Sequence, residues 1–312
     1  MKKIKEVAQP PVFDGRAQSK ITTMGNIIEV VTMQKPSGGC PCRKLDKDHY
    51  IDLRTGEMHE YRHIEHRAES CESIRKTLNR IRELINTNVT DPQCCRWLTF
   101  TYSENMTDKE RLYKDYFKFW KRFKYWCEKK GIKQPEYITI QEPQGRGAWH
   151  VHAFFIWQEK APFLPNEEIA RLWGHGFTKT KALQDCDNVG AYFSAYLGDM
   201  PLDEVEKLPE AEKTLAMEQH QMVLKTFTNE QELTKEKKFV KGGRLFLYPP
   251  GMNIVRKTKG IKEPIIERMN YFDIKEKVSA ATETFSRTYA IVDEAGEPLN
   301  YIHKAYYNSK RK

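Results

Sequence analysis

The middle of the chain alternates between hydrophobic patterns of helical and of strand spacing. Apolar residues recur every three or four positions over 69–87 and 108–130, which predicts two amphipathic helices. Shorter helices are expected over 165–173 and from residue 188. Runs rich in β-branched and aromatic residues predict four strands, over 96–102, 137–142, 149–157 and 176–183.

Local signals mark the ends of several of these elements. Asp108 is a suitable cap for the long helix and Gly131 a suitable end. Large apolar residues form its expected buried face: Leu112, Tyr116, Phe119, Phe123 and Trp126. The loop from Pro143 to Gly147 predicts a hairpin between the two strands beside it. The order strand, helix, hairpin, helix, strand, helix predicts an α+β fold, with an antiparallel sheet covered by helices on one face.

We expect the chain to consist of three parts. Residues 1–90 would form an N-terminal extension with a packing helix, 91–200 a central domain, and 201–312 a helical and basic C-terminal region. The first 39 residues are rich in Pro, Gly, Ser and Thr and are expected to be loosely ordered.

The C-terminal region itself divides into three segments. Residues 201–241 are polar and charged and are expected to form exposed helix. Residues 242–264 read as a basic loop punctuated by Gly and Pro, with phosphate contact as one use and a solvated loop as the alternative. The runs 287–292 and 300–307, on either side of a Glu-Ala-Gly-Glu turn, predict a terminal hairpin.

Composition adds a weak preference for a polyanionic partner. The 312 residues include 52 Lys and Arg against 43 Asp and Glu, a formal net charge of +9. The opening residues lack the apolar core of a signal peptide, and no apolar run is long enough to span a bilayer. We therefore expect a cytoplasmic protein with no membrane partner. Seven closely spaced cysteines form a poor disulfide framework, so reduced thiols are expected.

His150 and His152 are the chief candidates for metal ligands. Alternate side chains of a strand share a face, so the two imidazoles project together. If the hairpin turns near Arg146, Glu142 lies opposite His150 on that same face. Two neutral nitrogens and one carboxylate oxygen suit Mg²⁺ or Mn²⁺ near a phosphate. The alternative is a chance His-x-His pair, because the chain contains nine His.

Tyr192 and Tyr196 lie one turn apart on the helix expected from residue 188, and so share one of its faces. A phenol with an ordinary pKa of about 10 is a weak nucleophile at neutral pH, so it needs a cation at the phosphate that it attacks. Attack on a phosphodiester would give a 5′-phosphotyrosine and a free 3′-hydroxyl. The alternative is that one tyrosine only packs within the helix.

Three motifs together resemble those of the HUH endonucleases: WLTFTY (97–102), EPQGRGAWHVHAFF (142–155) and AYFSAY (191–196). The resemblance is to the rolling-circle replication initiators of bacterial phages, plasmids and integrative elements in particular. The run LYPPGMNIVRKTKGIKEP (247–264) is similar to the continuation in Gram-positive mobile-element members. The resemblance implies a ferredoxin-like (RRM-like) nuclease fold, a divalent metal and origin-specific nicking of single-stranded DNA.

By this resemblance the three candidate ligands match the paired histidines and the third ligand of the family, and Tyr192 and Tyr196 match its tyrosine motif. Many relatives place a Lys three residues after the nucleophile, whereas this chain has Ala195 and Asp199 there. The choice of nucleophile therefore stays open. With two tyrosines, one can cleave at initiation and the other at termination.

Other functions and partners stay open as well. No GxxxxGK[ST] motif is present in the sequence, so we expect a host helicase to unwind the DNA. A conjugative relaxase or an HUH transposase would use the same site chemistry on different DNA. A non-catalytic nucleic-acid-binding module would explain the basic charge without explaining the histidine pair. The oligomeric state is not indicated by the sequence.

Overall fold

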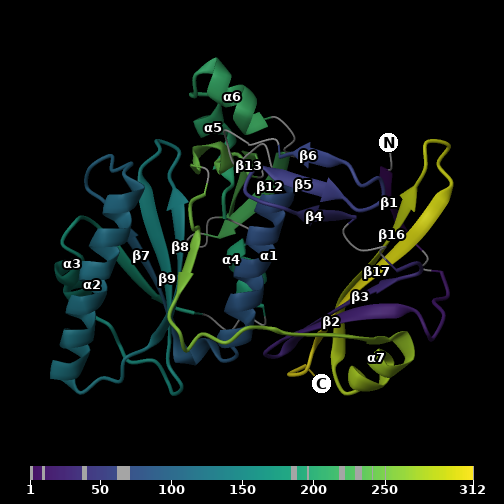
Figure 1. Cartoon of the computed structure of the whole chain (residues 1–312). Coiled ribbons are helices and arrows are strands. Elements are labelled where there is room, and N and C mark those ends of the chain that lie inside the picture. Colours follow the sequence, from purple (N-terminus) through teal and green to yellow (C-terminus); the bar gives the residue numbers. More distant parts are fainter. Residues whose placement is uncertain are drawn as a thin grey trace. The chain divides into compact units, whose positions relative to one another are not determined.

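The computed structural model describes residues 3–8, 11–36, 41–61, 71–183, 188–194, 197–217, 222–228, 234–240, 242–249 and 251–311 (Figure 1). The chain divides into two compact units. The larger unit comprises residues 64–263, and the smaller combines residues 1–63 with 264–312. This division differs from the three consecutive parts expected above, because strands near the two ends of the chain pair with each other.

The larger unit is built on a five-stranded antiparallel sheet in the order β10-β7-β9-β8-β14. Its strands are β7 (Cys95–Thr101), β8 (Glu136–Pro143), β9 (Trp149–Ile156), β10 (Thr178–Ala182) and β14 (Val255–Lys257). The four strands predicted for this region are confirmed. The fifth, β14, lies in the segment expected to be a loop, because it pairs with β8 from far away in the sequence.

Helices lie on both faces of this sheet rather than on one (Figure 1). They are α1 (Cys71–Asn88), α2 (Lys109–Lys130), α3 (Asn166–Trp173) and α4 (Val189–Ser194). On one face, Phe100 packs against Phe119 of α2 and Trp173 of α3. On the other, Phe193 of α4 packs against Phe154. The strand β9 requires this double cover because neighbouring residues on its two faces, such as Phe154 and Phe155, are both apolar.

The long helix α2 forms as its sequence predicts. The Asp108 side chain accepts hydrogen bonds from the N–H groups of Glu110 and Arg111. Gly131 ends the helix with a φ of 64°, a left-handed conformation that favours glycine. All five residues of its expected apolar face are buried: Leu112, Tyr116, Phe119, Phe123 and Trp126. This buried face fixes the helix against the sheet that carries the histidines.

The rest of the larger unit mixes short helices with strands. Its elements are η2 (Pro92–Cys94), β11 (Met200–Pro201), α5 (Leu202–Val205), α6 (Glu210–Met217), β12 (Met222–Thr228), β13 (Thr234–Val240) and η3 (Leu245–Leu247). The strands β11, β13 and β12 form a small sheet. The expectation of continuous exposed helix over 201–241 is therefore wrong for the two long strands, because their main-chain groups pair with each other. The described segments 242–249 and 251–263 also bury Leu245, Tyr248 and Met252, so they are not simply a solvated loop.

The smaller unit contains a six-stranded antiparallel sheet in the order β1-β16-β17-β3-β2-β15. Its elements are β1 (Lys3–Val7), β2 (Gln18–Met24), β3 (Ile27–Met33), β15 (Ile265–Asn270), α7 (Tyr271–Lys277), β16 (Thr282–Val292) and β17 (Pro298–Asn308). The predicted terminal hairpin is confirmed. The expectation of a loosely ordered beginning is wrong, because β1 pairs with β16 and β3 with β17.

A second, three-stranded sheet completes the smaller unit. It consists of β4 (Cys42–Lys44), β5 (His49–Asp52) and β6 (Met58–Glu60). Among the described helices of the whole chain, none has the length and apolar character needed to cross a membrane.

Candidate metal centre

The hairpin of β8 and β9 brings the three expected ligands together. Glu142 pairs directly with His150, and Ile140 with His152, so the three polar side chains share one face of the sheet. The turn is closed by a hydrogen bond from Gly147 N–H to the Gln144 carbonyl, and Gly147 has a φ of 82° that favours glycine. The register predicted from a turn near Arg146 is therefore confirmed.

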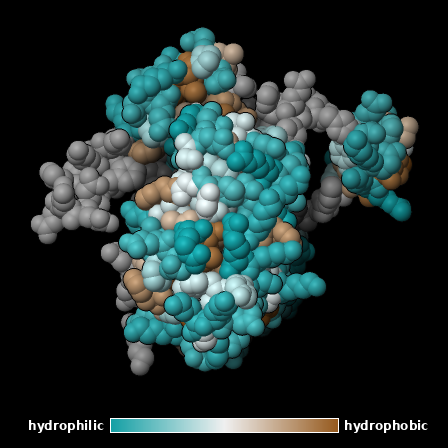
Figure 2. Space-filling view, turned by 90° about the vertical axis from the view of Figure 1, so that its left-hand side faces the viewer, coloured by the Kyte–Doolittle hydropathy of each residue, from teal (hydrophilic) through white to brown (hydrophobic). Residues whose placement is uncertain are grey.

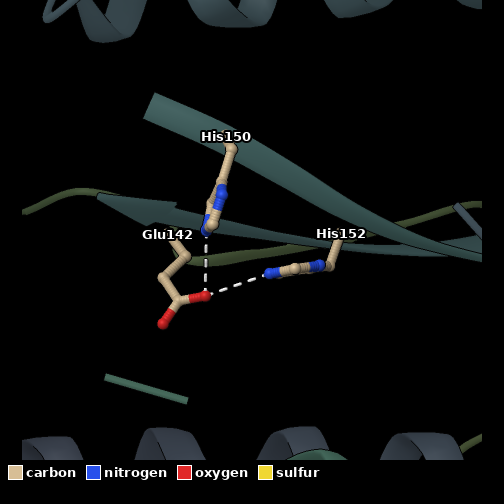
Figure 3. Close-up of side chains that lie close together, drawn as sticks. All are labelled: Glu142, His150 and His152. Carbon is tan, nitrogen blue, oxygen red and sulfur yellow. Dashed lines mark hydrogen bonds and ion pairs between the residues drawn. The ribbon is translucent and has the colours of Figure 1, made fainter. Parts of the chain in front are cut away.

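One carboxylate oxygen joins the two imidazoles. Glu142 Oε2 lies 3.0 Å from Nε2 of His150 and 3.0 Å from Nε2 of His152 (Figure 3). The ligand atoms of the three residues lie within 4.8 Å of one another. Each histidine side chain is 13% exposed and that of Glu142 only 6%. We call this group the triad.

The electrostatics of the triad favour an ionised glutamate beside neutral imidazoles. Burial raises the pKa of Glu142, but hydrogen bonds from both histidines outweigh burial and hold that pKa well below its ordinary value. Burial lowers the pKa of His150, although its hydrogen bond with Glu142 opposes the shift. A carboxylate and a neutral imidazole are the forms that bind metal ions.

Residues of β7 and α4 surround His152. Its Nδ1 lies 3.3 Å from Thr99 Oγ1, and Trp97 Nε1 donates a hydrogen bond to it at 3.4 Å. The ring of Phe193 crosses the imidazole edge-on, with ring centroids 5.3 Å apart. With Nε2 on a metal, Nδ1 must carry the proton and donate to Thr99, since the indole N–H of Trp97 cannot accept.

Two residues that the sequence did not single out contact the other oxygen of Glu142. Gly198 N–H donates to Oε1 at 2.9 Å, and Arg244 Nη1 lies 3.6 Å from the same atom. Arg244 also pairs with Glu204, while its buried Nε has no partner among the described residues. The sequence carries no local signal for Arg244, because it lies about a hundred residues beyond Glu142.

The two candidate tyrosines lie at the limit of the described chain. The backbone of Tyr192 belongs to α4, as expected, but its side chain is outside the described residues, and so is Tyr196. Their neighbours Phe193 and Gly198 are described, and each contacts a member of the triad. Both tyrosine assignments stay predictions.

The triad fits a divalent cation. Donor atoms on adjacent corners of an octahedron, about 2.1 Å from an ion, lie about 3.0 Å apart. The two nitrogen–oxygen distances of 3.0 Å match this spacing. Three protein ligands leave coordination positions open for substrate oxygens. The prediction that Glu142, His150 and His152 form a group able to bind metal is confirmed, whereas the identity of the ion stays a prediction.

Comparison with known proteins gave one match. Residues 95–200 match the model of a family described as replication-associated protein ORF2. The matched stretch covers about a third of the chain, runs from β7 to the start of β11, and includes the triad and α4. No curated protein and no solved structure matched the chain.

Proposed function

We propose that this protein is a rolling-circle replication initiator, an HUH-type endonuclease that nicks and rejoins origin DNA. A tyrosine of α4 or of the residues after it, Tyr192 or Tyr196, would be the nucleophile. Glu142, His150 and His152 would hold Mg²⁺ or Mn²⁺. The product would be a 5′-phosphotyrosine and a free 3′-hydroxyl from which synthesis can start.

The observation that carries this proposal is the buried triad within the stretch that matches a replication-associated family. The triad lies beside the segment that contains the tyrosines, because Phe193 and Gly198 each contact one of its members. Tyr196 is two residues from Gly198, so their Cα atoms lie at most about 7.6 Å apart. These contacts support a phosphate held between the metal and a tyrosine.

The bound metal would neutralise charge on the scissile phosphate and polarise it. The tyrosine oxygen attacks phosphorus and forms the new oxygen–phosphorus bond as the bond to the 3′-oxygen breaks. The phenol loses its proton and the departing 3′-oxygen gains one. Because one phosphoester replaces another, the reverse attack by a 3′-hydroxyl rejoins the strands without ATP.

Cleavage of single-stranded oligonucleotides from the DNA beside the gene tests the proposal. We expect a covalent protein–DNA adduct with Mn²⁺ and none with EDTA. The adduct should disappear with His150→Ala and with Tyr192→Phe, Tyr196→Phe or both, whereas the matched control Tyr289→Phe of the smaller unit should behave as wild type. DNA binding without any adduct would instead support a non-catalytic binding module.

The class of DNA that is cut separates the related functions. Specific cleavage at a replication origin supports the initiator, and cleavage at a transfer origin or at transposon ends supports a relaxase or a transposase. A separate host helicase is expected to unwind the duplex after nicking. Robust ATP-driven unwinding by the purified protein alone would contradict that expectation.

A further inference from the structure

The outer side of α2 carries a regular stripe of aromatic and basic residues. Tyr113, Phe117, Lys121, Tyr125 and Lys129 follow one another at intervals of four residues, and so lie along one side of the helix. We call these five residues the α2 stripe. Phe117 is 56% exposed and Tyr125 is 58% exposed, although the helix has ample apolar surface on its buried side.

A cation accompanies each exposed ring of the stripe. Lys121 Nζ lies 4.5 Å from the ring centroid of Phe117, and Lys129 Nζ lies 4.8 Å from that of Tyr125. The whole helix contains nine Lys and Arg against three Asp and Glu. Figure 2 looks onto the side of the larger unit where α2 lies, and shows a mainly hydrophilic surface with hydrophobic patches set into it. Positive charge beside exposed rings complements a polyanion with planar groups.

A small cavity lies at the N-terminal end of the stripe. It has a volume of about 220 Å³, and its lining includes Tyr113, Lys114, Tyr116 and Arg256. The Arg256 guanidinium carbon lies 4.6 Å from the ring centroid of Tyr113. Tyr116 is 94% buried, since its exposed fraction is 6%, and its hydroxyl has no hydrogen-bond partner among the described residues. A buried hydroxyl without a partner is unfavourable, so this end of the stripe can gain from a ligand that carries acceptors.

The stripe is on the opposite side of the sheet from the triad. Along β8, Glu142 and Ile140 face the same way as the two histidines. Tyr137 and Thr139 point to the other face, where they line the cavity beside α2. A ligand on the α2 stripe therefore does not occupy the metal centre.

We propose that the α2 stripe, with its adjoining cavity, is a second binding surface for single-stranded DNA. Bases stack on Phe117 and Tyr125, while Lys121, Lys129 and Arg256 neutralise phosphates. Stacking needs unpaired bases, which a duplex does not offer, so the exposed rings favour a single strand. In the simplest alternative, the lysine–aromatic pairs only stabilise the helix and bind nothing.

Fluorescence anisotropy with a labelled oligothymidylate and with a duplex of the same length tests this surface, using the full chain in EDTA. Stacking contributes about 1–3 kcal/mol per base, so Phe117→Ala/Tyr125→Ala should weaken binding of the single strand by about tenfold or more. Duplex binding should change little, and Phe117→Trp/Tyr125→Trp should retain affinity for the single strand. Phe163→Ala is the matched control, because Phe163 is 81% exposed and lies outside α2.

The salt dependence tests the cations separately. Lys121→Gln/Lys129→Gln should make the slope of log K against log salt shallower by about 1.4, as expected for two lost phosphate contacts on a single strand. Unchanged single-strand affinity in the aromatic variant, or an equal loss for duplex, would overturn the proposal. Since binding is measured without metal, loss of nicking in His150→Ala with intact binding would leave this surface standing, and failure here would leave the proposed nicking activity standing.

Discussion

At the scale of single residues, the centre of the larger unit depends on one carboxylate. Glu142 is bonded through one oxygen to both histidines and through the other to Gly198 N–H. It therefore links the hairpin to the chain that follows α4. Removing its charge should affect metal binding and local structure together.

Glu142→Gln should abolish the stabilisation that Mn²⁺ gives the folded protein. An ion at a hundred times its Kd stabilises a wild-type site by about 2.7 kcal/mol, and thermal unfolding with increasing Mn²⁺ measures this effect. The exposed Glu159, paired with Lys133 away from the triad, supplies the control Glu159→Gln. An undiminished Mn²⁺ response in Glu142→Gln would show that the ion binds elsewhere.

Arg244 is the cation nearest to the triad among the described residues, at 3.6 Å from Glu142 Oε1. A fixed positive charge beside a reacting phosphate stabilises the charge that develops on it, and removing one such group lowers the rate by about 100-fold. We expect Arg244→Gln to slow single-turnover adduct formation by that order and Arg244→Lys to recover part of it. Arg171→Gln, on the exposed side of α3, is the control. A normal rate in Arg244→Gln would exclude this role.

At the scale of elements, the hairpin of β16 and β17 contains a histidine that should make its stability depend on pH. Thr288 Oγ1 lies 2.9 Å from Nδ1 of His303, and burial lowers the pKa of His303 despite the nearby carboxylate of Glu283. The unfolded chain therefore binds the proton more readily than the folded one. Stability is complete above the ordinary pKa of about 6.5 and falls as the pH drops toward the lowered pKa.

Urea unfolding between pH 5 and pH 8 should reveal this dependence. His303→Gln should lessen the loss of stability on acidification, by at most about 1.4 kcal/mol per pH unit within that window. His59→Gln provides a comparison, since the His59 side chain is 43% exposed. Identical pH profiles for wild type and His303→Gln would contradict the assignment.

At the scale of the whole chain, an ion pair joins strands from its two ends. Lys304 of β17 lies 2.8 Å from Glu29 of β3. Burial opposes the charge of Lys304, but the neighbouring carboxylate outweighs burial and raises the pKa of the lysine. Glu29 is 11% exposed and Lys304 29% exposed, so the pair is only partly screened by water.

Lys304→Met should destabilise the smaller unit by about 1–2 kcal/mol, less than a fully buried pair would lose, because Lys304 keeps some contact with water. Glu29→Met/Lys304→Met should recover part of the loss, since no buried carboxylate is left without its ammonium. Urea unfolding of the single and double variants measures both effects. If the double variant lost as much as the two single variants together, the two residues would not be coupled.

Sequence alone predicted what depends on near neighbours. The cap at Asp108, the buried face of α2 and the opposition of Glu142 to His150 all follow from residues within a helical turn or one hairpin. Periodicity of 3.6 or of 2 determines which side chains share a face, so three ligands on one hairpin could be recognised without a structure. The same local patterns could not reveal the pairing of β14 with β8.

What only the tertiary structure decided are the contacts between distant segments. Gly198 and Arg244 reach Glu142 through the folding of the larger unit, and β1 and β3 become strands because β16 and β17 supply their hydrogen-bond partners. Such pairings leave no signal in the local sequence, since any exposed strand edge could accept them. The sequence by itself determined the ligands and the chemistry that they permit. Packing across the chain determined which charge, which backbone N–H and which second face of the sheet surround them.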